Sequence, residues 1–119
     1  MTNAKPVALV TGAATGIGRS AAVALAKNGY DVVVNFSRSE DAAKITEQQC
    51  QTAGARTLLQ RCDVSDDAGV RAMLAATAKE FGRLDVLINN AGTTVDVEPK
   101  NFEAMTVEDW NRVFNVNVL

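Results

Sequence analysis

Short apolar runs recur along this chain and predict strands. Such runs occupy residues 7–10 and 32–34, a largely apolar run occupies 84–88, and a weaker signal lies at 57–59. Continuous runs of this kind are typical of strands that are buried on both faces, as in parallel sheets. The pattern therefore predicts a parallel sheet that is covered on both faces.

Segments with apolar residues three and four positions apart lie between these runs and predict helices. Ser37, followed three residues later by Glu40, fits a capping box, and Ser65 and Thr106 stand where N-caps belong. Glycines stand where the first three helices should end. The predicted helices cover residues 19–28, 37–53, 65–81 and 107–119.

Strands and helices alternate in this order, which is typical of right-handed crossovers in an α/β fold. We therefore expect a Rossmann-type, doubly wound parallel sheet in a three-layer α/β/α arrangement, with residues 1–119 as one domain. Residues 89–100 are predicted to be loop, which would leave the fourth strand as an uncovered edge. Residues 115–119 have no cap glycine, no proline and no polar tail, so we expect a chain that is cut inside a helix and a fold that is incomplete at the C-terminus.

Composition excludes several kinds of function. The net charge of -2 argues against binding to nucleic acid or an anionic membrane. The absence of histidine excludes a Ser-His-Asp triad and a His-ligated zinc, and we expect no metal site. Residues 1–6 carry no apolar leader, which favours the cytoplasm. Cys50 and Cys62, without CxxC spacing, are expected to be reduced core residues.

A glycine-rich loop follows the first predicted strand. Its glycines are Gly12, Gly16 and Gly18, in the spacing G-x-x-x-G-x-G, and no lysine completes a P-loop. The first glycine suits a tight turn, a later one a close approach to a pyrophosphate, and the last the packing of the helix. Phosphates would lie at the N-terminus of that helix. A plain tight turn is the alternative interpretation.

Several motifs in order resemble one enzyme family. They are Thr11-Gly-x-x-x-Gly-Ile-Gly18, Asp63-Val64, Asn89-Asn90-Ala91-Gly92, and Trp110 followed by Asn117. Together they resemble the short-chain dehydrogenase/reductases, with most similarity to the 3-oxoacyl-acyl carrier protein reductase-like and glucose dehydrogenase-like group. The resemblance implies hydride transfer between a nicotinamide cofactor and a small carbonyl or alcohol substrate. It also implies subunit contacts through helix 107–119, hence a parent homodimer or homotetramer.

The resemblance also implies site residues. Asp63 would bind the adenine, although a cap or turn role is an alternative, and Asn89 and Asn90 could equally form turns. Asn117 is the one residue that matches a catalytic position, where the family holds a water. The implied cofactor-binding residues are Gly12, Thr15, Gly16, Ile17, Gly18, Asn35, Ser37, Arg38, Asp63, Val64, Asn90, Ala91 and Gly92.

The end of the second strand bears on the choice of cofactor. A carboxylate there would bind the ribose 2′-OH of NAD, whereas an arginine suits the 2′-phosphate of NADP. From Val34 onward no carboxylate appears before Glu40, and Arg38 lies about 20 residues after the glycine loop. NADP(H) is therefore favoured over NAD(H), while a solvated loop residue is the other interpretation of Arg38.

The family's catalytic Ser, Tyr and Lys have no match in these 119 residues. The one tyrosine is Tyr30, and the residue four positions after it is Val34 and not lysine. Two further hypotheses therefore stand beside an NADP(H)-dependent oxidoreductase. One is a catalytically inactive nucleotide-binding or subunit-interaction module. The other, a methyltransferase using S-adenosylmethionine, is disfavoured because the second strand lacks a ribose-binding carboxylate.

Overall fold

The fold alternates strands and helices, as the hydrophobic pattern predicts. The computed structural model describes residues 3–90 and 94–96. Its elements are β1 (Val7–Val10), α1 (Gly16–Lys27), β2 (Asp31–Phe36), α2 (Glu40–Thr52), β3 (Thr57–Arg61), α3 (Asp67–Phe81), β4 (Val86–Ile88) and β5 (Thr94–Asp96). The predicted helix 107–119 lies outside the described residues.

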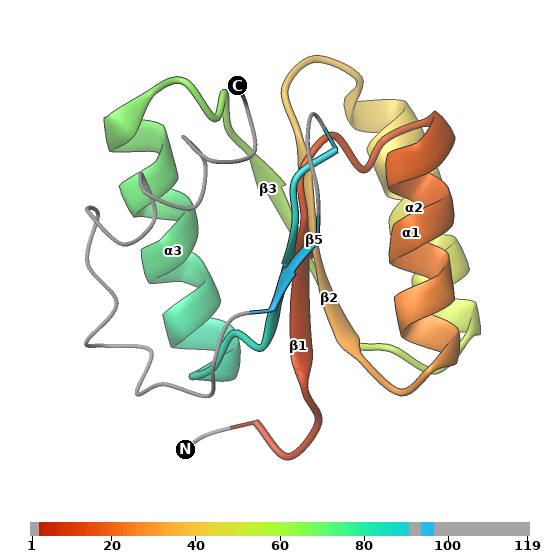
Figure 1. The fold of residues 1–119 in the computed structure, drawn as a ribbon. Coiled ribbons are helices and arrows are strands. Elements are labelled where there is room, and N and C mark those ends of the chain that lie inside the picture. The colour runs from red at the N-terminus through yellow and green to blue at the C-terminus, as the bar shows by residue number, and fades with distance from the viewer. Residues whose placement is uncertain (1–2, 91–93, 97–119) are drawn as a thin grey trace.

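The sheet has the order β3-β2-β1-β4-β5, and β1 to β4 are parallel. Helices α1 and α2 cover one face and α3 covers the other, which gives three layers (Figure 1). The expected Rossmann-type fold is thus confirmed. The chain runs from β1 to β2 and β3 on one side, then crosses to β4 on the other. Ligands of open α/β sheets bind at such a switch point, outside the carboxyl ends of the strands.

The prediction that residues 89–100 form only loop is wrong, because β5 lies within them. Its three residues pair antiparallel with β4, in the register Val86↔Asp96, Leu87↔Val95 and Ile88↔Thr94. Thr and Val have high strand propensity, and pairing satisfies backbone groups that an edge would leave to solvent. The expected uncovered edge at β4 is therefore covered in the structure.

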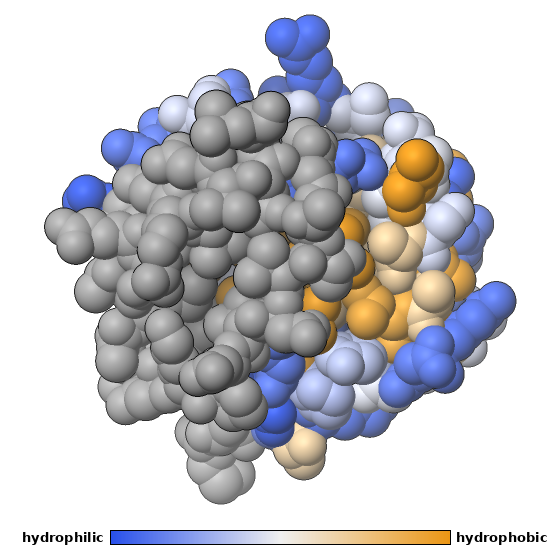
Figure 2. All heavy atoms as spheres, in the orientation of Figure 1, coloured by the Kyte–Doolittle hydropathy of each residue, from blue (hydrophilic) through white to orange (hydrophobic). Residues whose placement is uncertain are grey.

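Two apolar clusters fill the spaces on the two faces of the sheet. Leu9 and Val33 belong to the cluster beneath α3, while their neighbours Val10 and Val34 belong to the cluster beneath α1 and α2. Successive strand residues point to opposite faces, so burial on both faces requires the unbroken apolar runs of β1 and β2. Figure 2 also shows hydrophobic residues at the surface beside the segments drawn in grey.

Three predictions about where helices begin are wrong. Helix α1 begins at Gly16, inside the glycine loop, instead of at Arg19. Helix α2 begins at Glu40 with Ser39 as its N-cap residue, so Ser37 stands too early to cap it. The N-cap of α3 is Asp66, whose carboxylate accepts from the Ala68 N–H at 3.2 Å. Polar residues cluster before both helices, and sequence alone did not identify which one occupies the cap position.

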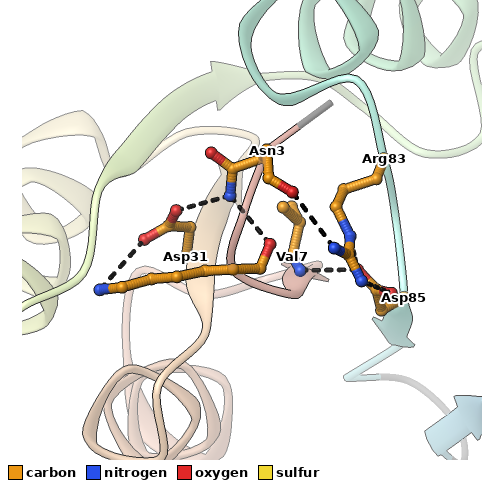
Figure 3. A network of polar contacts seen from close by, with 6 residues as sticks. Asn3, Val7, Asp31, Arg83 and Asp85 are labelled. Atoms are coloured by element: carbon orange, nitrogen blue, oxygen red, sulfur yellow. Dashed lines mark hydrogen bonds and ion pairs between the residues drawn. The ribbon is translucent and has the colours of Figure 1, made fainter. Parts of the chain in front are cut away.

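A network of polar contacts lies at the amino ends of the parallel strands (Figure 3). The buried carboxylate of Asp31 accepts from Asn3 Nδ2 at 2.8 Å and from the Arg56 N–H at 2.8 Å. Arg83 binds both oxygens of Asp85, and Asp85 also accepts from the N–H of Val7 at 2.8 Å. These contacts tie the starts of β1, β2 and β4 together at the edge opposite the carboxyl ends of the strands.

Both cysteines are free and buried, as predicted. Burial raises the pKa of the Cys50 thiol, and with a smaller contribution from the charge of Glu47 the pKa reaches about 11. Because the thiolate is the reactive form, Cys50 should react with iodoacetamide at pH 8 far more slowly in the folded chain than in urea. Mass spectrometry of labelled peptides measures this difference. Equal labelling rates in both states would contradict the burial of Cys50.

Candidate functional site

A cleft of about 550 Å³ opens at the carboxyl ends of the parallel strands. Segments that follow β1, β2, β3 and β4 all reach it, because the ends of parallel strands meet at one edge of a sheet. Its lining residues are Thr11, Gly12, Asn35, Ser37, Arg38, Cys62, Asp63, Val64, Asn89 and Asn90. The strand topology thus brings residues that are far apart in sequence into one site.

The glycine loop turns sharply from β1 into α1. Gly12 has a φ of +58°, in the left-handed region that disfavours side chains. A Cβ on Gly18 would lie 2.1 Å from the Gly12 carbonyl oxygen, so the first turn of α1 touches the loop backbone directly. Glycine is therefore required at Gly18 by close approach and at Gly12 by backbone conformation.

The first turn of α1 is open to solvent beside this loop. A Cβ built on Gly16 would meet nothing within 4 Å, and Ile17 is 80% exposed. Thr15 is the N-cap residue, yet its side chain makes no capping hydrogen bond. The first N–H groups of a helix are suited to an anion when no side chain caps them. This geometry fits the binding of a pyrophosphate.

Asn35, on β2, forms hydrogen bonds with the glycine loop. Its buried side chain accepts from the Gly12 N–H at 3.3 Å and donates to the carbonyls of Gln60 and Cys62 at 3.2 and 3.1 Å. Its backbone carbonyl accepts from the Ala13 N–H at 2.8 Å. From its position on β2, Asn35 therefore links the glycine loop to the end of β3.

The Asn pair after β4 holds the other side of the loop. The Asn90 N–H donates to Thr11 Oγ1 at 3.1 Å, and Asn90 Nδ2 donates to the Gly12 carbonyl at 3.4 Å. The Thr11 hydroxyl lies 3.3 Å from Asn89 Oδ1, and Asn89 is buried. These contacts link the ends of β1 and β4, so the two asparagines do more than form a turn.

Asp63 follows β3, lines the cleft and forms a tight turn. Its Oδ1 accepts from the Ser65 hydroxyl at 2.7 Å and from the Ser65 N–H at 3.0 Å. These bonds lower the pKa of Asp63, and the positive charge of Arg38 lowers it further. The carboxylate is therefore ionised at neutral pH, and the turn role considered for Asp63 is present in the structure.

Arg38 brings a positive charge to the cleft after β2. None of the ion pairs within residues 3–90 involves it. The preceding residue, Ser37, is held by its carbonyl, which accepts from Arg61 Nε at 3.3 Å. Sequence reasoning missed Arg61. The pairing of β2 with β3 places it beside Phe36, and that register is the signal that would have identified it.

The structure gathers most of the predicted site residues at one edge. Thr15, Gly16, Ile17 and Gly18 form the adjacent turn into α1. Ala91, Gly92 and Asn117 lie outside the described residues. The predicted residues that line the cleft are Gly12, Asn35, Ser37, Arg38, Asp63, Val64 and Asn90.

Comparison with known proteins identifies the family. The model of the short chain dehydrogenase family matches residues 6–119. This chain belongs to the short-chain dehydrogenase family. An uncharacterised oxidoreductase of Methylorubrum extorquens is 42% identical over 113 residues, which are 95% of this chain and 44% of that protein. A 3-oxoacyl-[acyl-carrier-protein] reductase of Staphylococcus aureus is 39% identical over 111 residues, which are 93% and 44% of the two chains.

Solved structures agree with this assignment to the short-chain dehydrogenases. A protein of Burkholderia xenovorans, described as a short-chain dehydrogenase/reductase, superposes with a TM-score of 0.75 at 35% identity, over 98% of this chain and 48% of its own. Hydroxysteroid dehydrogenase from Escherichia coli gives a TM-score of 0.68 at 33% identity, over 73% and 36% of the two chains. The chain thus spans about half the length of the relatives it matches.

Membership makes the chain part of an oxidoreductase family. Among residues 3–90 and 94–96, no helix is long and apolar enough to cross a membrane.

Proposed function

We propose that this short-chain dehydrogenase chain binds NADP(H) in the cleft, in preference to NAD(H), and serves hydride transfer to or from a carbonyl or alcohol substrate. The observation that carries the proposal is the position of Arg38. It lines the cleft immediately after β2 with Ser37, and no carboxylate lies between Asp31, at the start of that strand, and Arg38. A guanidinium binds phosphate by charge-assisted hydrogen bonds, whereas a carboxylate would repel it.

The residues present fit a dinucleotide. Gly12 lacks a side chain where a Cβ would lie 3.1 Å from Asn90 Nδ2, and Gly16 opens to free space, so backbone lines the phosphate region. We assign the pyrophosphate to the turn Thr15–Gly18 and the 2′-phosphate to Arg38 with Ser37. Asp63 and Val64 would hold the adenine, and Asn90 with the Ala91–Gly92 segment the ribose. The bound cofactor would donate the hydride to a carbonyl or accept it from an alcohol.

Proton transfer to the substrate oxygen is a separate requirement. The family resemblance assigns it to a tyrosine with a lysine four residues later, and the 119 residues contain no such pair. Tyr30 precedes β2, near the amino ends of the strands and away from the cleft. We therefore assign cofactor binding to the cleft residues and the Ala91–Gly92 segment, and Asn117 to the proton path as the resemblance implies.

We also propose a second candidate, a nucleotide-binding module without turnover. The two candidates differ in one measurement, which is NADPH oxidation with a panel of carbonyl compounds. Saturable NADPH binding without oxidation of any panel member would support the module. Oxidation that depends on the carbonyl compound would support the reductase.

Replacing Arg38 with glutamine tests the choice of cofactor. Loss of a hydrogen bond to a charged group costs about 1.5–3 kcal/mol. We therefore expect the Kd for NADPH to rise by about 10- to 100-fold, while the Kd for NADH changes less than about threefold. Isothermal titration calorimetry measures both constants.

Arg71→Gln is the matched control, because Arg71 is exposed on α3 and does not line the cleft. It should leave both constants unchanged. Equal weakening of NADPH and NADH by Arg38→Gln would show that Arg38 does not read the 2′-phosphate.

A further inference from the structure

Arg19 and Thr46 join the glycine loop to α2 through buried polar contacts. Thr46 is 0% exposed, and its hydroxyl lies 2.8 Å from the Ala13 carbonyl oxygen. Arg19 Nε donates to that hydroxyl at 2.9 Å, and Arg19 Nη2 donates to the carbonyls of Ala14 at 2.7 Å and Ala42 at 3.0 Å. The guanidinium of Arg19 thus binds three oxygens, one in the glycine loop and two in α2.

Arg19 directly follows the glycine motif, where a basic residue could be taken for a phosphate ligand. The structure directs its guanidinium elsewhere, since the three acceptors lie in the loop and in α2. Arg19 is also absent from the lining of the cleft. The guanidinium of Arg19 therefore binds the loop and α2.

These contacts fix the orientation of two peptide groups. In a planar trans peptide the carbonyl and the following N–H point in opposite directions. The carbonyls of Ala13 and Ala14 point toward Thr46 and Arg19. The N–H groups of Ala14 and Thr15 consequently point away from α2. The Ala13 N–H is bound to the Asn35 carbonyl of β2 at 2.8 Å.

We propose that Arg19 and Thr46 are positioning residues that hold the glycine loop in its phosphate-binding shape before the dinucleotide arrives. The inference deepens the proposed function and rests on it. A loop that is ordered in advance loses less conformational freedom on binding, so the pair raises affinity without touching the ligand. The effect concerns the pyrophosphate, which NADPH and NADH share, and not the 2′-phosphate.

Thr46→Val tests the proposal, because valine keeps the shape of threonine and removes its hydroxyl. The Kd for NADPH and the Kd for NADH should rise by the same factor, about tenfold, as measured by calorimetry. The Kd for adenosine 2′-monophosphate, which lacks the pyrophosphate, should stay constant. Thr46→Ser keeps the hydroxyl and should restore both dinucleotide constants.

A structural role alone would lower the melting temperature and leave these constants unchanged for the folded fraction. Unchanged dinucleotide constants in Thr46→Val would therefore overturn the proposal, as would equal weakening of adenosine 2′-monophosphate. If Thr46→Val does not fold, Arg19→Met serves instead, since it keeps the apolar stem and removes the donors. The same pattern of constants is expected, and a constant NADPH affinity in that variant overturns the proposal.

Amide hydrogen exchange without nucleotide separates this inference from the proposed function. The Ala13 N–H should exchange faster in Thr46→Val than in the wild type or Thr46→Ser. If the wild type binds neither dinucleotide, the proposed function fails, and the exchange rate of Ala13 still decides whether the pair orders the loop. Identical exchange in all three chains would show that it does not.

Discussion

Gly18→Ala is expected to raise the Kd for NADPH by at least about 100-fold, which is about 2.7 kcal/mol. The added Cβ would lie 2.1 Å from the Gly12 carbonyl oxygen, 2.8 Å from the Gly12 carbonyl carbon and 3.1 Å from Ala13 Cα. All three are backbone atoms, so no side-chain rotation relieves the clash. Either the loop or the first turn of α1 must move, and both form the proposed phosphate site. Calorimetric titration with NADPH measures the loss.

Gly54→Ala is the control for this substitution. Gly54 has a φ of +101° and follows α2, away from the cleft, with nothing within 4 Å of an added Cβ. Alanine there is strained by its backbone conformation and should lower the melting temperature without changing the NADPH constant. A Gly18→Ala chain with wild-type affinity would show that the contact between loop and helix does not shape the site.

Asp85→Ala is expected to lower the free energy of unfolding by about 2–3 kcal/mol at pH 7. The substitution removes the two bonds from Arg83 and leaves the N–H of Val7, a fully buried residue, without its acceptor. Asp85→Asn keeps an acceptor for Val7 and should lose less. Urea denaturation of the three chains measures the differences. Equal stability of Asp85→Ala and the wild type would contradict the assigned role of the network.

The same network predicts how stability depends on pH. Burial raises the pKa of Asp85, but the Arg83 guanidinium and the Val7 N–H lower it more, so the pKa lies below its usual value. A carboxylate with a lowered pKa in the folded state stabilises the fold fully above the usual pKa of Asp, about 3.9, and less as pH falls below it. Asp85→Asn should therefore be flatter than the wild type over this acidic range. Urea midpoints between pH 5 and 3 check this, and parallel curves would contradict it.

The sheet and most of the cleft could be predicted because burial on both faces leaves a direct mark on sequence. The runs at β1 and β2 are apolar at almost every position, since successive residues meet different helical layers. The glycine motif was informative for a similar reason, because Gly18 permits a contact that other residues forbid. Arg38 could be predicted as a site residue because the carboxyl end of β2 lies at the cleft in this fold.

Other features depend on tertiary contacts that leave weaker marks. Strand β5 is three residues long and is defined by its pairing with β4. Thr46 lies in α2, where a polar residue in a helix would ordinarily face solvent, and its partner Arg19 is 27 residues away. Arg61 gains its role from its register with Phe36. In each case a partner distant in sequence decides the role.

NADP(H) binding in the cleft is tested most directly by an NMR titration of the wild-type chain, labelled with ¹⁵N, against NADPH, NADH and S-adenosylmethionine. We expect saturable shifts with NADPH at amides of the cleft, including Gly12, Arg38 and Asp63, and weaker binding of NADH at the same residues. Amides at the opposite edge, such as Asp31 and Asp85, should not move. Saturation by S-adenosylmethionine alone, or NADPH shifts confined to residues outside the cleft, would contradict it.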